Sequence, residues 1–189
     1  MIRRLFLKRV QFKSFASLPS KDIEKRMMDA QIIFNQGIEK WNQDDMIGAK
    51  VAFEQSIKSH PTSDAWFNLA NVYQTIGNYE KALEYWKKSI ELSPRPDAHV
   101  NIANVKAIFQ KDPIGAIPHY ESALKLTPTD GEIRYNYGVV LDSCGKLEEA
   151  VEQYELAVMN GIELAEKNLR NAKARLLAKK INEQEPNKQ

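Results

Sequence analysis

The chain has 189 residues, of which 43% are hydrophobic and 28% charged, and these values fit one folded unit of ordinary size rather than a disordered or membrane-embedded protein. Its single cysteine, Cys144, cannot form a disulfide within the chain, and its three histidines lack the neighbouring cysteines or paired carboxylates of a metal site. The net charge of +2 combines a basic N-terminal segment with a mildly acidic remainder, so the charge balance gives little support to a broad nucleic-acid-binding surface.

Residues 1–20 form a basic segment that contains no acidic side chain. In a helix, Ile2, Phe6 and Val10 would form an apolar stripe, with most basic residues elsewhere. This pattern resembles a mitochondrial presequence, because a receptor groove can bind the stripe and the membrane potential attracts the charges. A secretory signal would need a longer uninterrupted apolar run. We therefore expect import into mitochondria, into the matrix, with cleavage after Val10 or nearer Ser20; a basic tail without a targeting role is the alternative.

Downstream of residue 30 the sequence contains an internal repeat, in which corresponding alanines are 33 or 34 residues apart. An aromatic residue follows each alanine by four positions, giving the pairs Ala49 and Phe53, Ala82 and Trp86, Ala116 and Tyr120, and Ala150 and Tyr154. A small residue stands 12 or 13 positions before each alanine, at Gly37, Ala70, Ala103 and Gly138. Pro61, Pro94 and Pro128 follow the first three aromatics. Small residues allow close helix contacts and proline ends a helix, so each copy is expected to be a helix-turn-helix unit.

The repeat resembles the tetratricopeptide repeat (TPR), most closely in its second copy. That copy supplies Trp66, Leu69, Ala70, Tyr73, Gly77, Tyr79, Ala82, Trp86 and Pro94 at the characteristic positions of the family. The resemblance spans residues 30–164 and implies an all-α fold, a right-handed superhelical solenoid of four TPR helix-turn-helix repeats plus a C-terminal capping helix. Two departures are Gln36 and Lys106, which replace the equivalents of Leu69 and Tyr73. The third copy lacks the glycine turn and is one residue longer there.

The predicted domain organisation has three parts. Residues 1–20 are the presequence, residues 21–180 the solenoid with its cap, and residues 181–189 a disordered tail without periodicity. The repeats are expected at about 30–62, 63–95, 96–130 and 131–164, and the cap at 165–180. In the cap, Ala165, Leu169, Ala172 and Leu176 form one apolar stripe. Such a helix can cover the apolar face that a last repeat leaves open.

An asparagine stands two positions before the small first-helix residue in every copy, at Asn35, Asn68, Asn101 and Asn136. We call these four residues the asparagine ladder. In the TPR family this position faces the concave groove, and the segments around Asn68 and Asn101 are similar to the repeats of O-GlcNAc transferase, in which such asparagines hold substrate peptides. A carboxamide both donates and accepts hydrogen bonds and can pair with a peptide backbone. Asn71 and Asn104 are expected to add a second row; the alternative is that these asparagines pair with neighbouring helices.

The resemblance implies a protein-binding adaptor or assembly factor in mitochondria that holds an extended polypeptide or a partner subunit in its groove. Trp66, Phe67, His99 and Tyr135 are candidates for side-chain pockets beside the ladder. We expect no catalytic residues, metal, cofactor, small-molecule substrate or membrane span, since the chain has no nucleophile with a base, no phosphate loop and no long apolar run. The alternatives are an RNA-associated or ribosome-associated mitochondrial repeat protein, similar to the pentatricopeptide proteins, and an integral subunit of a larger mitochondrial complex.

Overall fold

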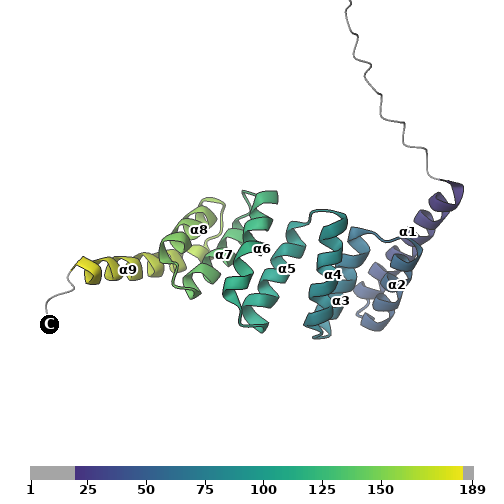
Figure 1. The fold of residues 1–189 in the computed structure, drawn as a ribbon, viewed down its shortest axis with the longest axis horizontal. Coiled ribbons are helices and arrows are strands. Elements are labelled where there is room, and N and C mark those ends of the chain that lie inside the picture. The colour runs from purple at the N-terminus through teal and green to yellow at the C-terminus, as the bar shows by residue number, and fades with distance from the viewer. Residues whose placement is uncertain (1–19, 185–189) are drawn as a thin grey trace, which may run out of the picture.

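The computed structural model of the chain describes residues 20–184, and this range contains helices and turns without a strand. The elements in chain order are α1 (Lys21–Asn42), α2 (Met46–Ser59), α3 (Ser63–Thr75), α4 (Tyr79–Leu92), α5 (Pro96–Asn104), the π-helical turn η1 (Val105–Phe109), α6 (Pro113–Leu126), α7 (Gly131–Ser143), α8 (Leu147–Met159) and α9 (Leu164–Gln184). Figure 1 shows these helices following one another along the long axis of the molecule. The predicted all-α solenoid is confirmed.

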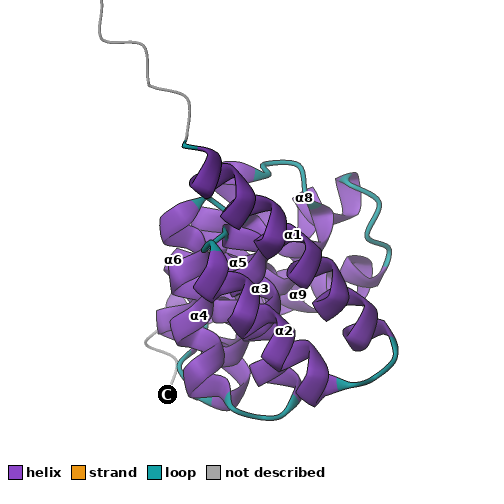
Figure 2. Ribbon diagram, turned by 90° about the vertical axis from the view of Figure 1, so that its right-hand side faces the viewer, coloured by secondary structure: helices purple, strands orange, loops and turns teal. Residues whose placement is uncertain are grey.

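Consecutive helices pair into four hairpins, α1–α2, α3–α4, α5–α6 and α7–α8, and each hairpin packs against the next. Figure 2 views this stack from the end formed by α1 and α2, with the later hairpins behind them. None of the helices between residues 20 and 184 combines the length and apolar character needed to span a bilayer. The predicted presequence lies outside the described residues, apart from Ser20, whose hydroxyl accepts from the backbone N–H of Ile23 at the start of α1.

Two helix boundaries differ from those expected from the repeat. Helix α1 begins at Lys21, well before the first repeat at residue 30, and α9 continues to Gln184, beyond the predicted end of the cap at residue 180. The periodic signal marks only residues that pack against another helix, so it misses a helix that extends past its neighbours. Residues 181–184 are therefore helical rather than part of a disordered tail.

Local signals explain where most helices begin and end. The side chains of Asp45, Asn78 and Asp112 each accept a hydrogen bond from a backbone N–H in the first turn of the second helix of a hairpin. The turns before these helices use left-handed backbone, with φ of 78° at Gly77 but 54° at Lys111. Glycine adopts this conformation without steric cost, whereas a residue with a Cβ does not.

The extra residue of the third copy lies in the turn η1, which ends α5. The Gln110 N–H donates to the Val105 carbonyl at 3.0 Å, a wider ring than an α-helix closes, and this arrangement accommodates one additional residue without breaking the helix. Lys106, which replaces a core tyrosine of the second copy, turns outward to form an ion pair with Asp112 at 3.1 Å. The length anomaly of the third copy is thus absorbed within its own hairpin.

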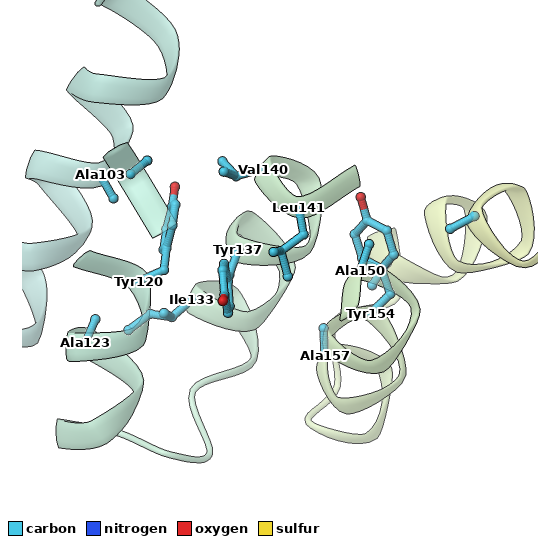
Figure 3. Packing of buried hydrophobic residues seen from close by; sticks show 13 residues of the cluster. Ala103, Tyr120, Ala123, Ile133, Tyr137, Val140, Leu141, Ala150, Tyr154 and Ala157 are labelled. Carbon is cyan, nitrogen blue, oxygen red and sulfur yellow. The ribbon is translucent and has the colours of Figure 1, made fainter. Parts of the chain in front are cut away.

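The repeated alanines and aromatics form the core, as Figure 3 shows for the C-terminal hairpins. Ala49, Ala82, Ala116 and Ala150 are fully buried, and Phe53, Trp86, Tyr120 and Tyr154 are at most 1% exposed. The glycines of the first helices permit the closest contacts. A Cβ added to Gly138 would lie 2.8 Å from the Tyr154 ring, and one added to Gly37 would lie 2.6 Å from Phe53. The aromatic of the second helix therefore packs directly on the backbone of the first.

Helix α9 covers the open side of the last hairpin. Ala165 and Ala172 are fully buried and belong to the same apolar cluster as Tyr154, with Leu169 packed against that cluster. Helix α9 packs mainly against α8 and also touches α7. The capping role predicted from the apolar stripe is confirmed.

Candidate functional site

The four asparagines of the ladder occupy the first helices of the four hairpins, α1, α3, α5 and α7. Asn35 is exposed, and Asn68, Asn101 and Asn136 are half-buried. None of the four belongs to the apolar clusters of the core. A polar side chain therefore recurs at the surface of the molecule in each successive hairpin.

The hydrogen bonds of the ladder engage only part of each carboxamide. Asn35 Oδ1 accepts from Gln31 Nε2 at 3.0 Å, and Asn68 Nδ2 donates to the backbone carbonyl of Asp64 at 2.9 Å. Within residues 20–184 the Asn136 side chain makes no hydrogen bond. Since a carboxamide has two N–H donors and an oxygen with two lone pairs, most of this capacity remains available to a ligand.

The second row, Asn71 and Asn104, has a different role from the ladder. Asn71 Oδ1 accepts a hydrogen bond from Trp86 Nε1 at 2.9 Å, and Asn104 Oδ1 accepts one from the Tyr120 hydroxyl at 2.5 Å. Both aromatic side chains are at most 1% exposed, so their polar ends need an acceptor within the protein. The oxygens of the second row thus satisfy buried donors, and only the nitrogens of their carboxamides remain for a ligand.

The two rows are connected across hairpins. Asn101 Nδ2 donates to Asn71 Oδ1 at 3.3 Å, so that oxygen accepts from both Asn101 and Trp86. This contact links a ladder residue on α5 to the buried indole of the preceding hairpin. The spacing of the asparagines does not predict these contacts. A sequence signal for them does exist, because an aromatic residue with a hydrogen-bond donor, Trp86 or Tyr120, follows Asn71 by 15 positions and Asn104 by 16.

A cavity of about 200 Å³ lies between α5 and α7, beside the ladder. It is lined by Asn101 and Asn136, by the apolar Val100 and Ile133, and by the carboxylates Asp97, Asp130 and Glu132. Arg95 pairs with Asp97 at 3.9 Å and also with Asp64. The cavity therefore combines two carboxamides with an excess of negative charge.

The aromatic residues expected to form side-chain pockets are half-buried and packed against other side chains. The Trp66 ring lies 5.2 Å from that of Tyr85, and the guanidinium of Arg95 lies 4.2 Å from the centre of the Phe67 ring. Tyr135 packs against Tyr154, with ring centres 6.2 Å apart. These three rings are thus partly engaged by other side chains, and their role beside the ladder stays a prediction.

His99, the fourth of these candidates, forms a pair with His119, with the two Nδ1 atoms 3.4 Å apart. Burial lowers the pKa of His119 to about 4, and His99, Lys106 and Lys87 add to the shift. Burial also lowers the pKa of His99. Both rings are therefore neutral near pH 7. The described residues contain no group of three or more histidine, cysteine or acidic side chains that could hold a metal ion.

Two segments of the chain match family descriptions. Residues 63–96 and residues 119–152 each match "Tetratricopeptide repeat". The chain is also 32% identical over 83 residues to the antiviral innate immune response effector IFIT1 of Macaca fascicularis. That alignment covers 41% of this chain and 17% of the relative, so the chain spans less than a fifth of that protein. Residues 63–96 coincide with the hairpin α3–α4, whereas residues 119–152 run from α6 through α7 into α8.

Several solved structures have the same fold. A MamA protein aligns with a TM-score of 0.65 and 26% identity, covering 84% of this chain and 93% of MamA. YrrB, described as a TPR protein with an unusual peptide-binding site, gives 0.65 at 20% identity over 89% of this chain and 93% of YrrB. PilW, a type IV pilus biogenesis factor, gives 0.65 at 20% identity over 77% and 69%. The architecture is that of a TPR solenoid.

Proposed function

We propose that this TPR solenoid is a protein-binding adaptor or assembly factor of mitochondria, and that its asparagine ladder holds an extended polypeptide segment of a partner. The observation that carries the proposal is the recurrence of a surface carboxamide at the same place in four successive hairpins, at Asn35, Asn68, Asn101 and Asn136. The buried donors Trp86 and Tyr120 do not require this recurrence, since they use Asn71 and Asn104, although Asn101 also donates to Asn71 in the preceding hairpin.

The chemistry of the ladder suits a peptide backbone. A carboxamide can accept from a backbone N–H while it donates to a backbone carbonyl, and an extended chain presents both groups at regular intervals. Such pairing depends little on the sequence of the bound segment. The acidic cavity beside Asn101 and Asn136 would then add a preference for a basic or neutral side chain at one position.

A polypeptide suits this surface better than RNA does. Asp97, Asp130 and Glu132 line the cavity next to the ladder, where their charge would repel a phosphate backbone, and binding of nucleic acid depends largely on phosphate neutralisation. Arg95 is paired with Asp64 and Asp97 rather than free to contact phosphates. The charges of the site thus favour a protein partner.

The ladder is tested by affinity capture from isolated mitochondria with the wild-type chain and the Asn68→Ala/Asn101→Ala variant. We expect the variant to lose the principal captured proteins while keeping its helical circular dichroism spectrum. The matched control is Asn42→Ala/Asn182→Ala, which removes two exposed helical asparagines outside the ladder and should capture the same proteins as the wild type. If the folded ladder variant captures the same proteins as the wild type, the ladder does not bind the partner.

The mitochondrial location rests on the basic, acid-free segment of residues 1–20. A fluorescent protein fused to residues 1–20 should accumulate in the matrix, and a fusion in which Arg3, Arg4, Lys8, Arg9 and Lys13 are replaced by glutamine should not. A cytosolic signal from the first fusion would contradict the location, although it would leave the binding surface unaffected.

A further inference from the structure

The capping helix α9 carries the same residue pattern as the first helices of the second and third hairpins. Residues 65–72, 98–105 and 165–172 share one pattern of eight positions. The pattern begins with alanine, has asparagine at its fourth and seventh positions and leucine or isoleucine at its fifth, and ends with valine or alanine. In α9 the two asparagines of the pattern are Asn168 and Asn171. They correspond to the ladder and to the second row, respectively.

Burial supports this correspondence. Ala65, Ala98 and Ala165, which begin the pattern in α3, α5 and α9, are all fully buried. The pattern differs at one place, where α9 has the exposed Arg170 instead of the small buried residue of α3 and α5. That residue is small in the hairpins because the second helix packs on it, and no second helix follows α9 in the described residues. Helix α9 thus has the residue pattern of the first helix of a repeat.

The fourth hairpin breaks the pairing of aromatic and asparagine. Val139 stands where the second and third hairpins have Asn71 and Asn104, so the aromatic Tyr154 has no equivalent acceptor in its own hairpin. Tyr154 is 1% exposed, and the side chain that interacts with its hydroxyl is Asn168, which lies on α9 rather than in the same hairpin. Figure 3 shows this hydroxyl pointing to the same side of the helices as that of Tyr120 and away from the side on which the Tyr137 hydroxyl lies.

Tyr154 lines a cavity of about 700 Å³ that lies between α7, α8 and α9. Val139, Asn168 and Asn171 line the same cavity. Burial raises the pKa of Tyr154 to about 12, and the charge of Asp142 adds to the shift, so the hydroxyl is protonated and able to donate.

The charges of this cavity neutralise each other. Arg175 forms an ion pair with Asp142, the one acidic residue among the lining side chains. Asn168 Nδ2 donates to the Tyr135 hydroxyl at 3.4 Å, which leaves its oxygen to accept. A neutral ligand with both donors and acceptors fits such a lining better than a charged group, and a peptide main chain is a ligand of this kind.

We propose that this cavity is the C-terminal end of the polypeptide-binding surface, where the Tyr154 hydroxyl donates to a main-chain carbonyl of the bound segment and Asn168 and Asn171 pair with the next main-chain amides. Helix α9 is then part of the binding surface as well as a cap. The inference rests on the proposed function, because it extends the ladder by one repeat.

The probe for this inference is a peptide selected from a random library of short peptides for binding to the full wild-type chain, labelled for fluorescence anisotropy. We expect Tyr154→Phe and Asn171→Ala each to raise the Kd by about three- to tenfold, the change that the loss of one hydrogen bond produces. Asn171→Ala should leave the unfolding midpoint unchanged, and Tyr154→Phe should lower it by less than Tyr120→Phe does, because Tyr154 lines an open cavity beside Asn168. Asn182→Ala, on the same helix but outside the cavity, should bind as the wild type does.

Tyr120→Phe is the matched control for Tyr154→Phe. It removes the same hydroxyl from the preceding hairpin, where the donor already has Asn104 as its acceptor. It should lower the unfolding midpoint and leave the Kd of the peptide within about twofold. If Tyr154→Phe instead behaves like Tyr120→Phe, its hydroxyl has a structural role and the inference is wrong.

The ladder variant separates this inference from the proposed function. If Asn68→Ala/Asn101→Ala weakens binding while Tyr154→Phe and Asn171→Ala bind as the wild type does, the surface ends before α9 and the proposed function stands. If the selected peptide binds all of these variants equally, both are wrong. If no peptide can be selected, the result counts against both as well.

Discussion

Trp86 and Asn71 are joined by a hydrogen bond from the indole nitrogen to the carboxamide oxygen, 2.9 Å long, between the two helices of one hairpin. The next hairpin repeats the arrangement with Tyr120 and Asn104. The bond lets a large aromatic fill the space between helices while its polar end remains paired. It also separates two kinds of asparagine on the same helix, one that completes the core and one that faces outward.

The first prediction concerns this pair. Asn71→Ala should lower the free energy of unfolding by about 1 to 3 kcal/mol, because the fully buried Trp86 side chain loses the acceptor for its N–H. Urea denaturation followed by circular dichroism measures the change. Asn68→Ala, whose side chain bonds only the backbone of its own helix, should change the same quantity by less than about 0.5 kcal/mol. Equal losses in the two variants would contradict the division between the rows.

A second prediction concerns the close contact between the first and second helices of the last hairpin. A Cβ at position 138 would meet the Tyr154 ring at 2.8 Å, and the ring is too tightly packed to move away freely. Gly138→Ala should therefore destabilise the protein by about 1 to 3 kcal/mol despite the better helix propensity of alanine. In a Tyr154→Leu background the same substitution should cost much less, and a double-mutant cycle by urea denaturation measures this coupling. Additive effects would argue against the contact.

A third prediction concerns the turn after the π-helical segment. Lys111 has a φ of 54°, whereas Gly77 and Gly145 occupy the corresponding turns of the second and fourth hairpins. Lys111→Gly should raise the stability by about 0.5 to 1 kcal/mol, because it relieves the left-handed strain at a position outside any helix. Thermal unfolding should show a higher midpoint. Gln55→Gly, on the exposed side of α2, should lower the midpoint. If Lys111→Gly lowers the midpoint as well, Lys111 is not strained.

The fourth prediction concerns pH and the pair of His99 and His119. The pKa of His119 falls from 6.5 to about 4 in the folded protein, so the unfolded chain takes up a proton first as the pH decreases. The contribution of the neutral His119 to the stability of the fold is therefore fully present above pH 6.5 and is lost as the pH falls toward 4. His119→Asn should reduce this loss in urea denaturation at a series of pH values.

Two carboxylates provide a comparison for that experiment. The pKa values of Asp45 and Asp112 lie below 3.8, mainly because backbone N–H groups of Gly48 and Gly115 donate to them. Their contribution to stability is present above 3.8 and is lost only at lower pH. If the free energy of unfolding falls equally between pH 6.5 and 4 in the wild type and in His119→Asn, the histidine pair does not cause that fall.

The repeat pattern was sufficient to predict the hairpins and their contacts. An alanine and an aromatic four positions later lie on the same face of a helix, so the sequence assigns pairs such as Ala82 and Trp86 to one interface. The length of the third copy also indicated an irregular turn there. Its form as the π-helical η1 could not be predicted, because it depends on how α5 and α6 pack after the extra residue is added.

What the sequence by itself determined is therefore the architecture, since each first and second helix carries its own apolar face and most of them carry their own end signals. Only the tertiary structure decided which asparagines complete the core and which remain at the surface. Asn68 and Asn71 are the same residue type one helical turn apart, and they differ because Trp86, on another helix, donates to only one of them. The role of a carboxamide is set by the donor that the fold brings to it, and spacing along the chain does not contain that information.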